Sequence, residues 1–555
     1  MSERTNRTAR RADPPGAVGA GRGWTLAVVC VATFMLLLDL TVVNVALPDI
    51  RETFDADFTS LQWVLDAYAL GLAAVLLTAG SLADRLGRKR VFNVGFVVFL
   101  LASLACGLAP DTTSLSVARG LQGLGGAVLF AIGPALIGQE YQGRDRGRAF
   151  GIFGGVVGLS IAFGPLIGGA LTDGINWRWI FLVNVPVGLA ALAISALRMR
   201  ESRAESAPGV DWWGLVLFSS ALTLLVLGLL RGEADGWGSA PIVSLFLVSV
   251  VLFGVFCAVE RRLGDRAMLD LSLFRNVTFN GLSVVTLLCA AATMSALFLL
   301  VSYVQNMLAF SPWETGLRFL PLTLTLFLAA AVAGSLTTRV PQRLLVGTSL
   351  ALISAGLTLV ALTGPDTTWT ALLPAMVGIG LGMGLFNPPR ASLSIAVAEP
   401  SKAGMASGIS ETFQQVGVAV GIAGFGAVFQ SRVTHLFTES EAGRQLGPNA
   451  EEFGEAVAAG GAAEAVGRAP EGLAAALDAA ARTAFVDGLT DVMIMCAAVS
   501  AVGAVVGYAF IRGRDLHESA RTAAPHGGEP PARTAAGPAP GGDGSAEQIP
   551  AAVSP

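Results

Sequence analysis

The chain has 555 residues, of which 53% are hydrophobic and 14% are charged, and its formal net charge is −4. A soluble protein carries about 25% charged residues, so this composition excludes an ordinary soluble protein. The net charge says little about partners, because the distribution of the charges matters more than their sum, and we expect no nucleic-acid partner.

Apolar runs of about twenty residues recur between Trp24 and Ile511. Each run is long enough to cross the hydrocarbon core of a bilayer, about 30 Å thick, as a helix. We therefore predict an all-α membrane protein with about fourteen transmembrane helices. The expected spans are 24–46, 61–83, 91–109, 113–138, 149–172, 177–197, 211–231, 240–260, 278–303, 316–338, 342–363, 368–394, 404–430 and 484–511.

The remaining segments divide the chain. Residues 1–22 form a polar arm, and the first apolar run is too long for a cleavable signal peptide. The tail 515–555 is rich in Pro, Ala and Gly, so we expect it to be disordered. The expected domains are a six-helix bundle at 23–205, two linker helices at 206–275, and a second six-helix bundle at 276–514 that includes a long outer loop at about 431–483.

Two similar segments support two related bundles. Gly80–Lys89 follows the second predicted span, and the partly similar Gly334–Arg343 follows the tenth. Transporters are commonly built from repeated halves around a midplane site. Thr338 stands opposite Asp84 in the second copy, so the acidic side chain is not repeated.

Positive charges give the expected orientation. The even number of spans puts both termini on one side. The short connections on that side hold seventeen Lys and Arg residues, against three in the other short connections. Lys and Arg concentrate in cytoplasmic loops, so both termini are expected in the cytoplasm. Heavy use of Ala, Gly and Arg suggests a bacterial plasma membrane.

Few charges fall within the apolar spans, chiefly Asp39, Asp66, Arg119 and Glu411. A charge near the bilayer centre costs about 2.5–3.5 kcal/mol on insertion scales, so such residues usually face a cavity or a partner. They are therefore candidates for function, although structural ion pairing is the alternative.

Asp39 and Arg119 are expected at similar depths, so they can pair if the first and fourth spans touch. A carboxylate balanced between an arginine and dry surroundings can load and release a proton. Arg119 keeps its own proton, so its expected role is to tune a neighbouring acid. Gln122 lies on the same helix face.

Asp66 and Glu411 suit a second role, because a carboxylate in an apolar cavity attracts a lipophilic cation and can also carry a proton. Gln415 shares the helix face of Glu411. The sequence does not divide the proton and substrate roles between the two acids.

Small residues mark two candidate gating segments. In the fifth span, Gly164 and Gly168 allow close helix packing, and Pro165 can kink the helix. After the second span, the loop contains the gating candidates Gly80, Asp84, Arg85, Gly87 and Arg88. Asp84 can pair with a helix end or an arginine when the cytoplasmic side closes.

Five segments together resemble the major facilitator superfamily, specifically its fourteen-spanner drug:proton antiporter branch. They are Leu38–Pro48, Gly80–Arg90, Ala118–Gly123, Gly154–Gly169 and Trp177–Pro186. The resemblance covers about residues 24–511 and implies proton/substrate antiport, with export of drugs or antibiotics by alternating access.

The resemblance also implies roles for the intramembrane charges. Asp39 and Arg119 become candidates for proton coupling, and Asp66 and Glu411 resemble acidic positions of members that export lipophilic cations. Together with the reasoning above, the proton-coupling candidates are Asp39, Arg119 and Glu411. The substrate-binding candidates are Asp66, Glu411, Gln122 and Gln415.

Other classes fit less well. No GxxxxGK[ST] loop is present, so neither ATP hydrolysis nor an ATPase subunit is indicated. No nucleophile–base or metal-ligand set is found, and the five cysteines form no CxxC pair, so we expect no enzyme activity, metal or cofactor. The open alternatives are proton-coupled uptake of a small metabolite and a non-transporting membrane sensor or scaffold.

Overall fold

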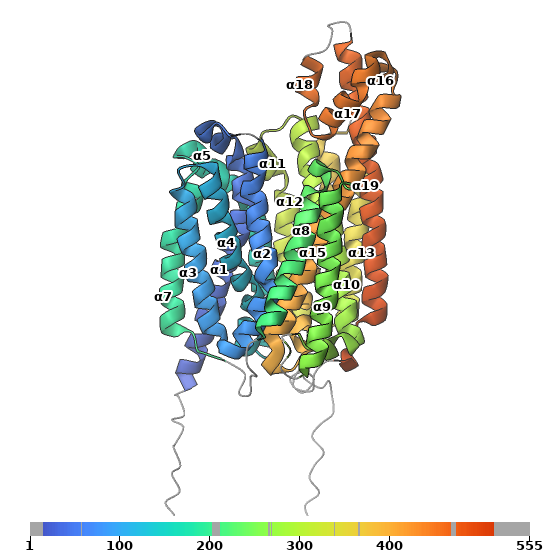
Figure 1. Cartoon of the computed structure of the whole chain (residues 1–555). Coiled ribbons are helices and arrows are strands. Elements are labelled where there is room, and N and C mark those ends of the chain that lie inside the picture. Colours follow the sequence, from blue (N-terminus) through green and yellow to red (C-terminus); the bar gives the residue numbers. More distant parts are fainter. Residues whose placement is uncertain are drawn as a thin grey trace, which may run out of the picture.

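The computed structural model describes residues 15–56, 58–202, 211–264, 267, 269–337, 339–364, 367–467 and 473–515. Over these residues the chain forms helices joined by short connections (Figure 1), which confirms the predicted all-helical class. Most of the tail predicted to be disordered, residues 516–555, lies outside this description, as do residues 1–14 of the polar arm.

The described helices have these bounds: α1 Pro15–Phe54, α2 Phe58–Leu86, α3 Arg88–Gly107, α4 Thr112–Glu140, α5 Gly143–Gly174, α6 Trp179–Leu182, α7 Asn184–Arg198, α8 Trp212–Asp235, α9 Ala240–Leu263, α10 Val277–Ser302, α11 Pro312–Arg318, α12 Leu320–Leu336, α13 Gln342–Ala361, α14 Leu373–Ala396, α15 Ala403–Glu439, α16 Glu441–Leu446, α17 Ala450–Ala458, α18 Ala462–Gly467 and α19 Ala474–Phe510. Short helical turns lie at η2 Leu271–Arg275 and η5 Pro400–Lys402.

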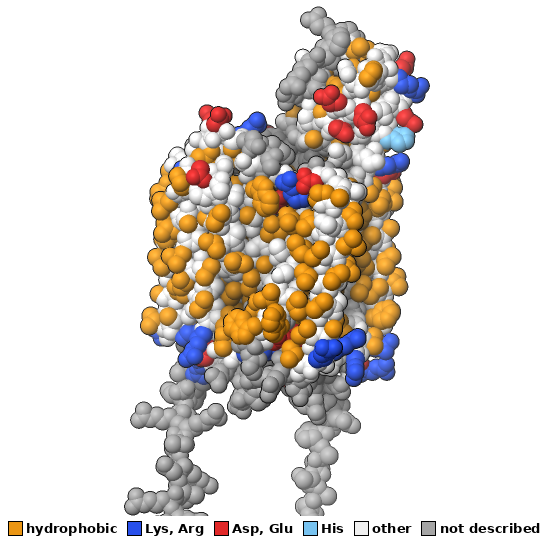
Figure 2. All heavy atoms as spheres, viewed as in Figure 1, with side chains coloured by type: hydrophobic (Ala, Val, Ile, Leu, Met, Phe, Trp, Pro, Cys, Tyr) orange, Lys and Arg blue, Asp and Glu red, His pale blue; other side chains and the backbone are white. Residues whose placement is uncertain are grey.

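Twelve helical stretches among the described residues are long and apolar enough to cross a membrane. One of them joins α6 and α7 into a single stretch, Trp179–Arg198. The 32-residue α5 and the 17-residue apolar α12 occupy the two other predicted spans. Figure 2 shows the corresponding surface, an apolar belt with charged side chains gathered at its two ends. This distribution is what a bilayer requires of a spanning bundle.

The helices pack as two bundles and a hairpin. In the first bundle α2 and α3 pack on α4, and α1 packs on α5. In the second, α12 and α13 pack on α14, while α10 packs on α15 and α19. Contacts of α5 with α12 and of α2 with α15 join the two bundles. The hairpin of α8 and α9 lies against α2 and α15 at the seam between the bundles (Figure 1).

One end of the molecule is rich in arginine and lysine (Figure 2), and we call it the basic end. The exposed Arg90, Arg200 and Arg261 lie at the start of α3, just after α7 and in the last turn of α9. The two bundles touch directly near this end. Arg146 of α5 donates a hydrogen bond to the carbonyl oxygen of Ser392 in α14, over 3.1 Å. A β-carbon added at Gly147 would overlap the backbone of Gly334 in α12, so only glycine permits this crossing.

The opposite end carries a helical projection. The sequence places a loop at about 431–483, and the described part of that segment is largely helical. The long helix α15 extends to Glu439, and α16, α17 and α18 follow before α19 begins at Ala474. Residues from Ala474 onward form the first part of α19. Phe437 stacks on Phe453 with ring centroids 4.8 Å apart, so an apolar contact holds the projection together.

Candidate functional site

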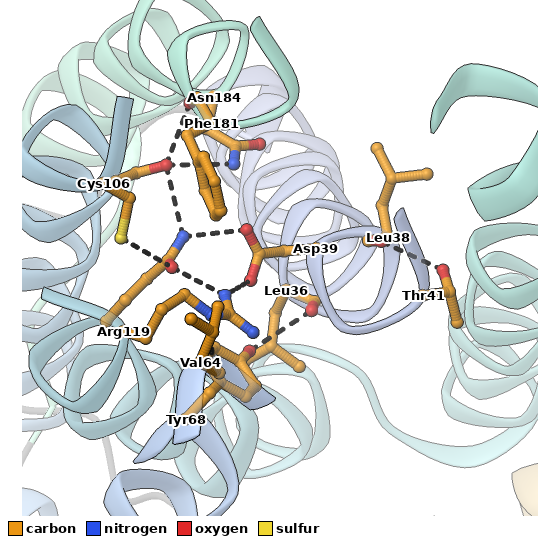
Figure 3. Close-up of polar contacts among 12 residues, drawn as sticks. Leu36, Leu38, Asp39, Thr41, Val64, Tyr68, Cys106, Arg119, Phe181 and Asn184 are labelled. Carbon is orange, nitrogen blue, oxygen red and sulfur yellow. Dashed lines mark hydrogen bonds and ion pairs between the residues drawn. The ribbon is translucent and has the colours of Figure 1, made fainter. Parts of the chain in front are cut away.

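Asp39 and Arg119 form an ion pair inside the first bundle (Figure 3). Asp39 comes from α1 and Arg119 from α4, and their exposed fractions are 2% and 1%. The other carboxylate oxygen, Oδ1, accepts a hydrogen bond from Nε2 of Gln122 over 2.9 Å. Both oxygens of Asp39 therefore have a donor.

Arg119 is fixed from several sides. Its Nε donates to the carbonyl oxygen of Val64 in α2 over 3.2 Å, and its Nη1 donates to Oε1 of Gln122 over 2.8 Å. Its guanidinium carbon lies 4.1 Å from the ring centroid of Tyr68, a cation–π contact. Because Arg119 cannot release its proton, a proton on Asp39 would leave this buried guanidinium without a countercharge. Proton binding to Asp39 therefore competes with the ion pair.

Hydrogen bonds with neighbouring polar side chains orient Gln122. Its Nε2 also donates to Oγ of Ser103 over 3.2 Å, and Ser103 accepts a hydrogen bond from Nδ2 of Asn184 over 3.1 Å. Ser103 itself donates to the carbonyl oxygen of Phe181 (Figure 3). Ser103, Asn184 and Tyr68 are not among the site residues predicted from the sequence. Asn184 does stand inside the Trp177–Pro186 marker, which was the available signal.

A second buried ion pair lies in the other bundle. Nη2 of Arg390 in α14 is 3.1 Å from Oε1 of Glu411 in α15, and Nη1 donates to Oγ of Ser410 over 3.1 Å. Their exposed fractions are 4% and 1%. Arg390 was missed because the predicted span ends only four residues after it, which suggests a charge at the membrane surface. Gln415 is half-buried one turn from Glu411.

Asp66 lies apart from both pairs. It is 7% exposed, and its Oδ2 has no hydrogen-bond partner among the described groups. The nearby cation is Arg231 of α8, at the hairpin, which interacts electrostatically with Asp66 but is hydrogen-bonded to Asp235 over 3.0 Å. The structure thus places Asp66 beside the α8–α9 hairpin, with an unused acceptor.

The predicted gating loop joins the two bundles at the basic end. Asp84, near the end of α2, accepts hydrogen bonds from the backbone N–H groups of Gly404 and Met405, over 3.0 and 2.9 Å. These groups are the first turn of α15, where the helix dipole favours a negative charge. Arg88 also binds Asp84, with Nη2 2.7 Å from Oδ1. A helix end and an arginine therefore share one carboxylate.

Glycines make that contact possible. A β-carbon added at Gly80 would overlap the carbonyl oxygen of Gly404, so α2 and α15 cross at backbone contact. Gly87 has a φ of 111°, which favours glycine at the turn between α2 and α3. Arg85, the remaining loop candidate, donates from Nη2 to the carbonyl oxygen of Ala267 over 2.7 Å, toward the linker.

The α5 glycines face two neighbours. A β-carbon at Gly164 would overlap Thr41 of α1, and one at Gly168 would contact Val42, so this part of α5 packs inside its own bundle. A β-carbon at Gly155 would instead meet the ring of Phe327 in α12, across the seam. Pro165 lies among the residues whose side chains the structure does not describe. Within the described residues, no group of three or more His, Cys, Asp or Glu side chains could hold a metal ion.

Comparison of the chain with known proteins identifies its family. Residues 29–422 match the model of the Major Facilitator Superfamily. The chain is 34% identical to the tetracenomycin C resistance and export protein of Streptomyces glaucescens, over 89% of this chain and 93% of that one. It is 38% identical to a puromycin resistance protein of Streptomyces alboniger, over 72% and 80% of the two chains.

A solved structure shows the same fold. The human organic anion transporter MFSD10 superposes with a TM-score of 0.57 at 13% identity, covering 88% of this chain and all of that one. At this identity the likeness concerns the fold alone. Together with the family match and the two Streptomyces relatives, the helical architecture shows that this chain belongs to the Major Facilitator Superfamily of membrane transporters.

Proposed function

We propose that this transporter is a proton-coupled antiporter that exports small hydrophobic molecules, including cations, by alternating access. The relatives named for tetracenomycin C export and for puromycin resistance support export of drug-like molecules. The excess of Lys and Arg at the basic end supports a cytoplasmic orientation of that end and of both termini. We expect a bacterial plasma membrane, no cofactor, and no ATPase subunit, with the proton gradient as the energy source.

The single observation that carries this proposal is the buried Asp39–Arg119–Gln122 network. In the described state Arg119 and Gln122 occupy both oxygens of Asp39. A proton reaches this carboxylate only when the ion pair separates, and re-forming the pair expels it. An exchange of this kind couples proton transfer to helix movement, which is the physical requirement of an antiporter.

The Arg390–Glu411 pair supplies the complementary site in the second bundle. Glu411 is held by a single arginine, and Arg390 has an Nε without a hydrogen-bond partner, so this pair is less fully satisfied than the first. A lipophilic cation can replace the arginine as the countercharge of Glu411. We assign Glu411 and Gln415 to substrate binding, and Glu411 also to proton exchange.

The contacts at the basic end support alternating access. Asp84 links the end of α2 to the start of α15, and the glycine crossings at Gly80 and Gly147 bring the bundles together there. Opening toward the cytoplasm requires that these contacts break. In this proposal the described state is therefore closed to the cytoplasm.

The driving force is sufficient. Moving one charge through 100 mV is worth about 2.3 kcal/mol. Since about 1.4 kcal/mol corresponds to a tenfold ratio, one proton exchanged for one neutral substrate sustains a gradient of roughly fifty-fold before any pH difference is added. Exchange of one proton for one monovalent cation moves no net charge, so the pH difference drives export in that case.

The test is ethidium efflux from pump-deficient bacteria that express the chain, with and without a protonophore. We expect efflux that stops with the protonophore and with Asp39→Asn at matched expression. Asp478→Asn is the control, because Asp478 forms an exposed ion pair with Arg482 outside the bundle core. Efflux that survives the protonophore would refute proton coupling, and protonophore-sensitive accumulation would refute export. Efflux that is coupled but indifferent to Asp39→Asn would remove Asp39 from the mechanism.

A further inference from the structure

A pair of acidic side chains lies at the basic end of the α8–α9 hairpin, outside the two buried ion pairs. Asp211 precedes α8 and is 8% exposed, while Glu260 lies near the end of α9 and is 1% exposed. Oδ1 of Asp211 accepts a hydrogen bond from the Gly214 N–H over 2.8 Å. Oε2 of Glu260 accepts one from the Leu269 N–H over 2.9 Å. One oxygen of each carboxyl group is thus used in local structure.

The two remaining oxygens face each other. Oε1 of Glu260 has no hydrogen-bond partner among the described donors, although Glu260 is almost fully buried. A β-carbon added at Gly214 would overlap both Oε1 of Glu260 and Oδ2 of Asp211. Both oxygens therefore lie next to Gly214. The two carboxyl groups are within hydrogen-bonding reach of each other. Ionised carboxylates only accept hydrogen bonds, so this contact needs a proton between them.

The surrounding charges are consistent with one bound proton. Arg85 of α2 interacts electrostatically with both acids. Lys402 of η5 and Asp270, which precedes η2, are already paired over 2.6 Å. Loss of the proton would leave an excess negative charge in a buried place, and adjacent like charges disfavour that state.

Three other charged side chains near this region are either paired or exposed. Asp84, which also interacts electrostatically with Arg85, is already bound by Arg88 and the start of α15. Arg261 and Arg262 follow Glu260 on α9, but both are exposed. Among the described residues, Arg85 is therefore the partly buried cation that acts on both acids.

We propose that Asp211 and Glu260 form a further proton-binding site that holds one shared proton and, with Arg85, ties the α8–α9 hairpin to the gating loop. Arg85 is adjacent to Asp84 in the chain and also holds the linker through the Ala267 carbonyl oxygen. Proton loss separates the start of α8 from the end of α9 beside the Asp84 contact. The placement of this site on the cytoplasmic side rests on the proposed orientation, which makes it a sensor of cytoplasmic pH.

The test is infrared spectroscopy of the purified full-length chain in lipid nanodiscs, titrated from about pH 5 to about pH 9, a range that includes documented values for buried Glu. We expect a carbonyl band of protonated carboxylic acids that fades as the pH rises. In Glu260→Gln and in Asp211→Asn, this band is expected to be weaker by the intensity of one carboxyl group. Each amide keeps the size of the carboxyl, and the Gln amide can donate to Asp211 in place of the shared proton.

Asp270→Asn is the matched control. Partial burial disfavours ionisation of Asp270, but hydrogen bonds from Lys402 and Ser272 outweigh it and lower its pKa, so Asp270 stays ionised throughout the titration. The band is expected to be unchanged in this variant. An unchanged band in Glu260→Gln or Asp211→Asn as well, or no titrating band in the wild type, would overturn the proposal.

Hydrogen exchange provides a second measurement on the same samples. Amide protection around Leu269, whose N–H binds Glu260, is expected to fall at high pH in the wild type after correction for the intrinsic exchange rate, and to stay constant in Glu260→Gln. A pH-independent wild type would refute the link between the proton and the hairpin. Neither readout needs transport, so a normal titration with no ethidium efflux would defeat the proposed export function alone.

Discussion

Replacing Asp39 by Asn removes the countercharge of a guanidinium that is 1% exposed. Arg119 keeps hydrogen bonds to the Val64 carbonyl oxygen and to Gln122, but its charge has no other carboxylate partner in the described network. Breaking a buried ion pair by removing one partner costs about 3–5 kcal/mol, because the other charge stays buried. We expect Asp39→Asn to lower the free energy of unfolding by that amount.

The compensating variant separates stability from coupling. In Asp39→Asn/Arg119→Gln both charges are gone, so about 2 kcal/mol or more of the loss is expected to return. Proton-driven efflux is expected to stay absent in the single and the double variant. The assay is reversible unfolding in mixed micelles with increasing SDS, alongside ethidium efflux at matched expression. Single variants that unfold within about 1 kcal/mol of the wild type, or a double variant that regains efflux, would refute the reasoning.

Three further predictions concern the other contacts. Gly80→Val is expected to prevent closure at the basic end and to abolish efflux, because even its β-carbon would overlap the Gly404 carbonyl oxygen. Gly254→Val is the control and is expected to keep activity, because a β-carbon at Gly254 would meet no atom within 4 Å. Equal efflux in the two variants would contradict this prediction. Asp84→Asn keeps the shape but loses the charge that binds Arg88 and the start of α15, so the closed state is expected to weaken by about 1–3 kcal/mol. Spin-label distances across the basic end would measure the shift, and distances identical to those of the wild type would refute it. Arg390→Gln leaves Glu411 buried without its cation and is expected to lower the free energy of unfolding by about 3–5 kcal/mol. Part of this loss is expected to return in Arg390→Gln/Glu411→Gln. Losses that simply add in the unfolding assay would contradict an interaction between the two residues.

Local properties of the chain predicted the helical class and most of the intramembrane acids. A spanning helix must satisfy its backbone hydrogen bonds internally and must be apolar over its whole length, so each span can be recognised without its neighbours. For the same reason Asp39, Asp66 and Glu411 stand out, because an acid within an apolar run is expensive wherever the helix packs. The accumulation of Lys and Arg on one side is likewise a property of the sequence alone.

Helix packing decided which charges meet. Glu411 was identified from the sequence, but its partner Arg390 lies on the preceding helix near a predicted span end, and depth within a bundle is not encoded locally. Asp39 and Arg119 lie at similar predicted depths, yet only the contact of α1 with α4 brings them together. Ser103 and Asn184 are ordinary small polar residues until folding places both beside Gln122.

The same reason explains the segments that sequence patterns described poorly. Asp211 and Glu260 are the end residues of two predicted spans and resemble solvated end charges, but packing of the hairpin against α2 buries both beside Arg85. Composition at 431–483 indicated a polar loop, whereas extended α15 and α19 and the contact of Phe437 with Phe453 stabilise helices there. The sequence by itself determined the helical class, the segments apolar enough to span and the side on which Lys and Arg gather, because hydropathy and charge act on each segment separately. Only the tertiary structure decided which charges neutralise one another, because burial and pairing depend on helices far apart in the chain.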